Sequence, residues 1–99
     1  MMVRANAVVG ADGVAVVQVT PTTNQTWTIS HMTIEMVPPS PVQPQAIVRL
    51  EQSLICGSNQ GNGDTADGAV IVVAAGQALT VTWTGAAPGA IATLMLLYT

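Results

Sequence analysis

The fold is decided by the last quarter of the chain, which runs Gly76-Gln-Ala-Leu-Thr-Val-Thr-Trp-Thr-Gly-Ala-Ala-Pro-Gly-Ala-Ile-Ala-Thr-Leu-Met-Leu-Leu-Tyr98. Residues Ala78 to Thr84 alternate between large apolar side chains and Thr or Ala, the two-residue period of a strand with one buried face. Gly85 to Gly89 supplies strand-breaking Gly and Pro. Ala90 to Tyr98 is apolar on both faces, so this strand needs cover on both sides. We therefore predict two long strands joined by a turn, with part of the cover supplied by another subunit.

The composition is unusual for a soluble domain. A chain of 99 residues fits one domain, residues 1–99, and 49% of its residues are hydrophobic. Only 7% are charged and Lys is absent, whereas an ordinary soluble domain has about 25% charged residues. A spanning helix is excluded because no run approaches the roughly 18 apolar residues that it needs. The neutral surface instead indicates a subunit that contacts neighbours, since the cores of interfaces are depleted of charge.

Charge and cysteine content exclude further classes. The net charge is −3 and the only strong cations are Arg4 and Arg49, so the clustered basic residues that bind phosphates are missing and no nucleic acid is expected. Cys56 is the single cysteine, which excludes an intrachain disulfide and a zinc-finger site. The start of the chain lacks the apolar core and cleavage pattern of a signal peptide, so we expect no export by that route.

The rest of the chain divides into strands separated by Gly and Pro. The alternation changes phase near Ser30 and His31, which predicts a bulge there. The polar stretch Gly57–Gly68 carries several glycines and predicts a long loop. We predict further strands over Val3–Val9, Val14–Thr20, Gln25–Val37, Gln45–Gln52 and Ala69–Ala74, while Ser53–Cys56 either continues the strand before it or forms a separate short strand. With the terminal pair this makes roughly seven or eight antiparallel strands and no helix, an all-β, single-domain β-sandwich or jelly-roll-like fold.

A proline-rich stretch, Val37-Pro-Pro-Ser-Pro-Val-Gln-Pro44, follows the longest predicted strand. Its prolines remove backbone donors and hold the chain extended, so we predict a surface loop or arm that lies on a neighbour. We expect the second apolar face of the final strand to be covered by oligomerisation. The predicted interface residues are therefore Val37, Pro38, Pro39, Pro41, Pro44, Leu94, Leu96 and Tyr98.

No arrangement of titratable residues predicts catalysis. His31 and Glu35 could share a strand face, but no third ligand follows nearby, which favours a structural histidine. Cys56 has no base assigned beside it, which favours an inert buried thiol over a nucleophile. The loop around Asp64 and Asp67 offers oxygens for Ca²⁺ but lacks the spacing of a helix–loop–helix site. We expect no catalytic residue, no cofactor and no metal.

Two tryptophans leave two interpretations open. Trp27 and Trp83 could stack on sugars if they were exposed. Each lies mid-strand among inward apolar positions, however, which favours core packing with the indole N–H bonded. A glycan site would then have to come from the loops Gly57–Gly68 or Gly85–Gly89.

Three segments resemble a family of small virion proteins from tailed bacteriophages, especially those that infect actinobacteria. They are the Trp strand Gln25–Met32, the Gly/Asp-rich loop Gly57–Gly68, and the stretch Gly76–Leu94 with its Trp, Gly and Pro-Gly-Ala hairpin. The likeness covers roughly residues 25–98, and most of the charged and Tyr-bearing positions of such proteins hold Val, Ala or Gln here. The resemblance implies a β-sandwich subunit of a phage particle. It assigns no catalytic residue to any position of this chain.

These observations together lead to an expected function. We expect a non-enzymatic capsid decoration or cement protein, present in the virion and assembled in the host cytoplasm, that binds across joints between capsid subunits. Its expected partners are the major capsid protein and further copies of itself in a homotrimer, with no nucleic acid and no membrane. The alternative is a minor tail or head-fibre module that binds glycans on the host surface.

Overall fold

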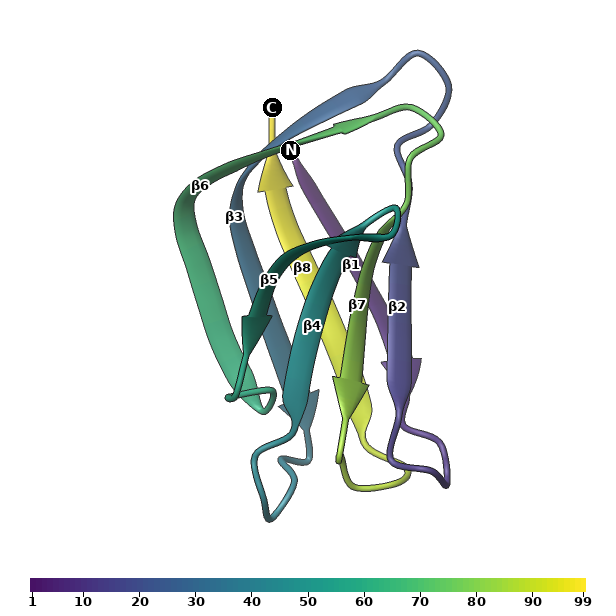
Figure 1. The fold of residues 1–99 in the computed structure, drawn as a ribbon, viewed down its shortest axis with the longest axis vertical. Helices are drawn as coiled ribbons and strands as arrows, with labels where there is room; N and C mark the ends of the chain where they lie inside the picture. The colour runs from purple at the N-terminus through teal and green to yellow at the C-terminus, as the bar shows by residue number, and fades with distance from the viewer.

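Two antiparallel four-stranded sheets pack face to face in the computed structural model (Figure 1). The structure describes residues 1–67 and 71–99, and over this part of the chain it has eight strands and no helix. The strands are β1 (Met2–Val8), β2 (Ala15–Val19), β3 (Thr26–Val37), β4 (Gln45–Leu50), β5 (Ser53–Ser58), β6 (Gly63–Ala74), β7 (Leu79–Thr84) and β8 (Ile91–Tyr98). The predicted all-β sandwich is confirmed.

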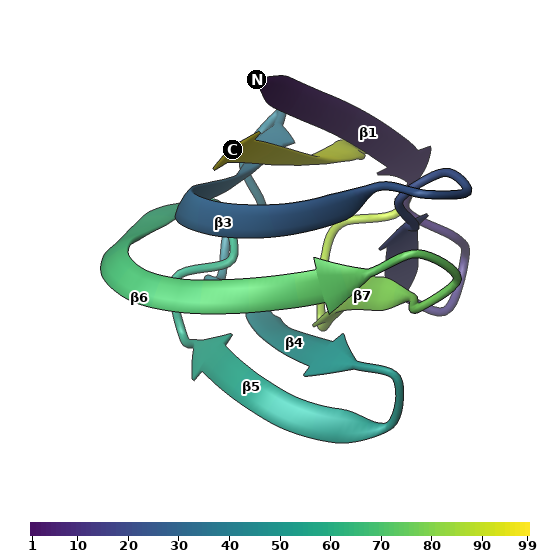
Figure 2. The ribbon, with the colours of Figure 1, turned by 90° about the horizontal axis from the view of Figure 1, so that it is seen from above.

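The strand order follows from one long folded hairpin. Sheet A has the order β1-β8-β3-β6 and sheet B the order β2-β7-β4-β5. Strands from the start of the chain pair with strands from its end. The pairs are β1 with β8, β2 with β7, β3 with β6 and β4 with β5. Pairing of β3 with β8 and of β4 with β7 then joins these ribbons into the two layers seen from above in Figure 2. This is the topology of a jelly roll.

The two predicted terminal strands and the turn between them are confirmed, but the hairpin that the resemblance implied does not form. β7 lies between β2 and β4 in sheet B, whereas β8 lies between β1 and β3 in sheet A, so the two strands do not pair with each other. The connection from Gly85 to Gly89 crosses from one sheet to the other, and both glycines adopt positive φ, 72° and 87°. Turn-forming residues therefore marked the reversal correctly but could not show that it crosses the sandwich.

The predicted loop Gly57–Gly68 is also wrong. β5 continues to Ser58 and β6 already begins at Gly63, so only a short turn separates them. β6 is an edge strand with polar outward positions, and this composition looks like a loop in the sequence. Part of the predicted strand Ala69–Ala74 lies outside the described residues. The predicted bulge is confirmed by a register shift between Ile29 and His31.

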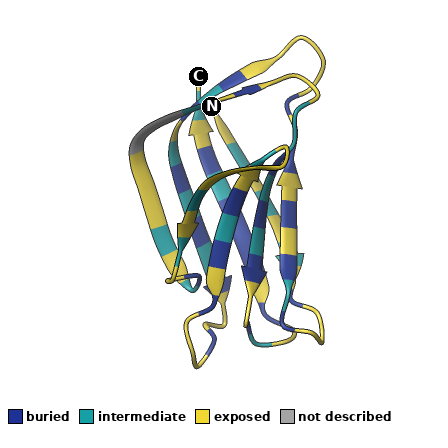
Figure 3. Ribbon diagram, in the orientation of Figure 1, coloured by how far each residue is buried: buried dark blue, intermediate teal, exposed yellow. Residues whose placement is uncertain are grey.

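The core between the sheets is almost entirely aliphatic. Along most of the strands buried positions alternate with intermediate or exposed ones, whereas β8 has three buried residues in a row, Ala92, Thr93 and Leu94 (Figure 3). Trp83 is fully buried, and its Nε1 donates to the carbonyl of Gly61 at 3.0 Å. A side chain at Gly61 would meet the carbonyl oxygen of Pro44 at 2.7 Å, so this close approach requires glycine. The largest fully buried side chains are Trp83, Ile29, Leu79, Leu94, Leu96, Val73, Val81 and Pro44.

The two open sides of the sandwich differ. On one side β1 contacts β2, and the inward residues Val3, Ala5 and Ala7 of β1 pack against the core. On the other side, between β5 and β6, a cavity enters the space between the sheets. The open side between β5 and β6 is therefore a candidate surface for binding.

Candidate interaction surfaces

Loops gather at the end of the sandwich that is lowest in Figure 1, where β1, β3, β5 and β7 end. Buried Ser40 and its neighbour Asn62 hold three of these loops together. The Ser40 amide donates to Asn62 Oδ1 at 2.8 Å, and Asn62 Nδ2 donates to the Ser40 carbonyl at 2.9 Å. The amide of Ala87 donates to Ser40 Oγ at 2.9 Å. The proline-rich loop is therefore a fixed part of the surface.

Exposed apolar side chains cover one side of this end. Val8 pairs with Ile91 and Ile91 pairs with Val37, so the three side chains lie in one row across sheet A. Their exposed fractions are 66%, 46% and 60%, and that of Val42 in the adjoining loop is 76%. We name this surface the end strip; it comprises Val8, Val37, Pro38, Pro39, Pro41, Val42 and Ile91. Clustered exposed apolar residues are typical of interaction sites.

The predicted interface residues divide between this strip and the interior. Val37, Pro38, Pro39 and Pro41 are exposed and belong to the end strip. Pro44 is buried against Gly61. Of the predicted interface residues in the proline-rich loop, only Pro44 is therefore buried.

The predicted interface on the final strand needs correction. Leu94 and Leu96 are fully buried between the two sheets of their own chain, where no neighbour can reach them. Tyr98 is half-buried, and its ring centre lies 4.9 Å from that of Trp27. The exposed apolar residues of β8 are instead Ile91 and Leu97, which face outward from sheet A. Both faces of the strand are apolar, so the pattern could not show which one the fold itself covers.

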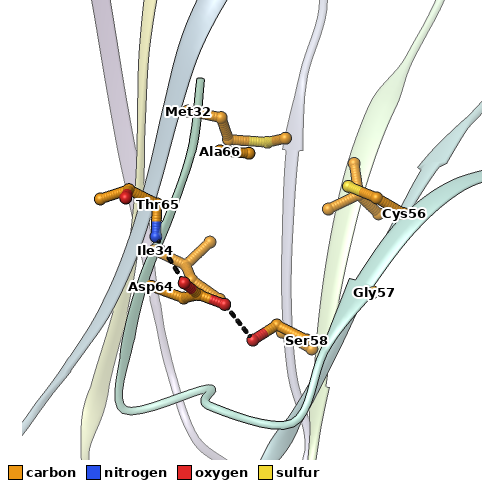
Figure 4. A pocket seen from close by; sticks show the side chains of 10 residues that line it. Met32, Ile34, Cys56, Gly57, Ser58, Asp64, Thr65 and Ala66 are labelled. Atoms are coloured by element: carbon orange, nitrogen blue, oxygen red, sulfur yellow. Dashed lines mark hydrogen bonds between the residues drawn. The ribbon is translucent and has the colours of Figure 1, made fainter. Parts of the chain in front are cut away.

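A second surface is the cavity between β5 and β6, about 140 Å³ in volume, which we name the edge cleft (Figure 4). Small or short side chains face each other across it and leave the gap between the sheets unfilled. At its mouth Ser58 Oγ donates to Asp64 Oδ2 at 2.5 Å and links the two edge strands. A neighbouring cavity of about 100 Å³ shares part of its wall. The edge cleft is lined by Met32, Ile34, Ala46, Val48, Cys56, Gly57, Ser58, Asp64, Thr65 and Ala66.

Two titratable groups line the edge cleft. The hydrogen bond from Ser58, followed by that from the Thr65 amide at 2.8 Å, lowers the pKa of Asp64. Burial, followed by the negative charge of Asp64, raises the pKa of the Cys56 thiol. At neutral pH the cleft therefore holds a carboxylate at its mouth and a protonated thiol inside. His31 and Cys56 both line the neighbouring cavity, but the raised pKa keeps the half-buried thiol protonated at neutral pH, which argues against a nucleophile.

The remaining charged residues do not converge on a site. On the outer face of sheet A, His31 contacts Asp67, and Arg4 lies 3.5 Å from Glu35. Asp67 faces outward from β6, whereas Asp64 faces the cleft. Within the described ranges 1–67 and 71–99, no group of three or more His, Cys, Asp or Glu side chains could hold a metal ion.

Both tryptophans are buried, at 4% exposed for Trp27 and 0% for Trp83. Trp83 has its N–H bonded, but Trp27 Nε1 is buried without a hydrogen-bond partner among the described residues. Neither ring is available to stack on a sugar at the surface. Core packing is therefore confirmed for both, and the predicted N–H bond for one of them.

Comparison with known proteins identifies no family. Neither the scan against protein-family models nor the search of curated proteins returns a match for this chain. In the part of the chain that the structure describes, no helix is long and apolar enough to cross a membrane.

Proposed function

We propose that this chain is a non-catalytic virion structural protein, a capsid decoration protein that binds across joints between capsid subunits. The observation that carries the proposal is the end strip, which is apolar and exposed and whose loop is held by partly buried hydrogen bonds. A rigid apolar surface binds without the entropy cost of ordering a loop. The jelly-roll topology is compatible with this role, since it occurs in viral capsid domains, but it also occurs in lectins and cupins and does not decide between them.

Burial of the end strip supplies the binding free energy in this proposal. Covering a few hundred Å² of apolar surface at ~25 cal/mol per Å² yields several kcal/mol before association costs. The low charge fits this mechanism. Only 7% of the residues are charged, so few charged groups would lose their water when the surface is buried. Prolines add surface that carries no backbone donor to leave unsatisfied.

The proposed partners are the major capsid protein and further copies of the chain. The end strip serves the capsid. The outward residues of sheet A beyond it, Met2 and Leu97, are exposed and lie opposite each other in the pairing of β1 with β8. They offer a separate apolar contact between copies, which we propose form a homotrimer.

Cosedimentation tests the proposal. The chain is mixed with capsids assembled from the major capsid protein of the same genome, and bound copies are counted per capsid subunit. We expect Val42→Asp to weaken binding at least tenfold, because it places a charge in the buried contact. Val16→Asp, an exposed valine on the outer face of sheet B, is the matched control and should bind normally. Unchanged binding by the Val42 variant would contradict the proposal.

The alternative is a minor tail or head-fibre module that binds host glycans. The outer face of sheet B supports it with neutral hydrogen-bonding side chains, among them Gln18, Thr80 and Thr82. This face has no aromatic ring, which weakens its case as a sugar platform. Copy number separates the two roles: hundreds of copies per particle support decoration, whereas six or twelve support a tail component. Glycan-array binding that Thr82→Val abolishes would support the alternative.

A further inference from the structure

The edge cleft is an incompletely filled part of the core. Protein interiors have few voids larger than a water molecule. An apolar cavity of ~150 Å³ stays dry and accepts a ligand the size of benzene. The edge cleft has about 140 Å³, and its deep walls are the apolar side chains of Met32, Ile34 and Val48. It can therefore take an apolar group of about six non-hydrogen atoms.

The mouth of the edge cleft selects for positive charge. Asp64 is the one ionisable carboxylate among the lining residues, and no cation lies among them. Its Oδ2 accepts from Ser58 and its Oδ1 from the Thr65 amide, so each oxygen retains a lone pair, because a carboxylate offers about four acceptor positions. With one position on each oxygen already used, a point-like ammonium fits better than the planar fork of a guanidinium.

We propose that the edge cleft binds a lysine side chain of a neighbouring protein, with the methylene stem between the sheets and the ammonium on Asp64. The chain contains no Lys, so the group must come from another molecule. Its net charge of −3 favours the approach of a cation. This inference deepens the proposed function, on which it rests only for the identity of the neighbour.

The test uses the isolated full chain and a small probe. Amide chemical shifts are followed by NMR while n-pentylammonium, which has six non-hydrogen atoms like the ligand expected above, is added. The controls are 1-pentanol, which has the chain without the charge, and pentanoate, which has the opposite charge. We expect shifts at Cys56, Ser58 and Ala66, and binding of pentylammonium about fivefold tighter than pentanol, since the carboxylate is partly solvated. Pentanoate should bind most weakly.

Variants separate the charge from the cavity. Asp64→Asn should reduce the affinity for pentylammonium to that for pentanol and leave pentanol unchanged. Asp67→Asn, on the outward face of the same strand, is the matched control and should keep the preference for the cation. Cys56→Leu fills the cleft and should abolish binding of both probes. If this variant does not fold, protection of the Cys56 thiol from iodoacetamide by pentylammonium in the unmodified chain tests the same occupancy.

The outcomes separate this inference from the proposed function. Equal binding of pentanoate and pentylammonium, or shifts confined to the end strip, would overturn the lysine site even if capsids still bind the chain. Selective pentylammonium binding that Asp64→Asn removes would support the site even if capsids do not bind. Capsid binding that pentylammonium also weakens, in the unmodified chain but not in the Asp64→Asn variant, would support both.

Discussion

The two edges of this sandwich are built from similar strands but end in different ways. At the β1/β2 edge, inward Val and Ala side chains, including Val17, meet and close the core. At the β5/β6 edge, the inward positions are Cys56, Ser58, Asp64 and Ala66, and a cavity enters between the sheets. The difference lies in side-chain volume and polarity at a few facing positions. An open edge therefore needs no change in topology.

The comparison also separates stability from binding. Side chains at the closed edge fill space that nothing else can fill, so they contribute to folding. Side chains at the open edge leave space that another molecule can fill, so they contribute little to folding and can be shaped for a ligand. Substitutions at matched positions test this division.

The largest effect is expected from truncation at the closed edge. Val17→Ala should lower the free energy of unfolding by about 2 kcal/mol, because Val17 is buried and the vacated space cannot collapse fully. Cys56→Ala at the open edge should cost less than about 1 kcal/mol, since its site is already hollow. Urea unfolding of both variants measures the difference, and equal costs would contradict the division between the edges.

Enlargement should reverse the order. Ala15→Leu at the closed edge should destabilise the fold by roughly 1–3 kcal/mol, because buried Ala15 has no room for a larger side chain. Ala66→Leu should be neutral or slightly stabilising, since it extends into the edge cleft. Thermal unfolding of the two variants and the parent chain measures both changes in stability. A large loss from Ala66→Leu would show that the cleft is not available space.

A smaller, pH-dependent effect is expected from Ser58→Ala. The Ser58 hydroxyl is the first cause of the lowered pKa of Asp64, so its removal should raise that pKa towards the ordinary value of 3.8. A depressed folded-state pKa contributes stability above pH ~4 that is lost as pH falls through the folded value. The variant should therefore differ from the parent chain near neutral pH and converge with it at lower pH. Carboxyl-carbon NMR titration measures the shift, and an unmoved Asp64 would contradict it.

The smallest effect is expected away from both edges. Arg4 and Glu35 form an exposed pair at 3.5 Å on the outer face of sheet A. Arg4→Gln should change the free energy of unfolding by no more than about 0.5 kcal/mol, because exposed ion pairs are screened by solvent. The same urea assay supplies the baseline for the edge variants. A loss as large as that of Val17→Ala would mean that this face is not simply solvated.

Much of the fold could be predicted from the sequence because alternation is a direct record of burial. The alternation from Ala78 to Thr84 predicts that Leu79, Val81 and Trp83 share one face, and all three are fully buried. The phase change at Ser30 and His31 predicted the bulge. These features depend only on neighbours along the chain, which the sequence displays.

The remaining features depend on partners distant in sequence. Nothing local distinguishes a turn within a sheet from one between sheets, so the residues Gly85 to Gly89 predict a turn but not that it crosses from sheet B to sheet A. β8 is apolar on both faces, so the sequence does not show which face is exposed to solvent. The edge cleft requires Ala66 to face Cys56 across two sheets, and that pairing exists only once the fold is known.

The pairing of first strands with last strands has a consequence for how this protein is made. β8 lies between β1 and β3, and β7 lies between β2 and β4, so neither sheet is continuous until the final strands have left the ribosome. At ~5–20 residues per second, synthesis takes several seconds, during which β1 and β2 lack β8 and β7, the strands with which they pair. The inward apolar side chains of β2 therefore have no sheet partner to protect them until β7 is made. Synthesis of β7 and β8, rather than growth of the domain from its amino end, therefore makes both sheets continuous.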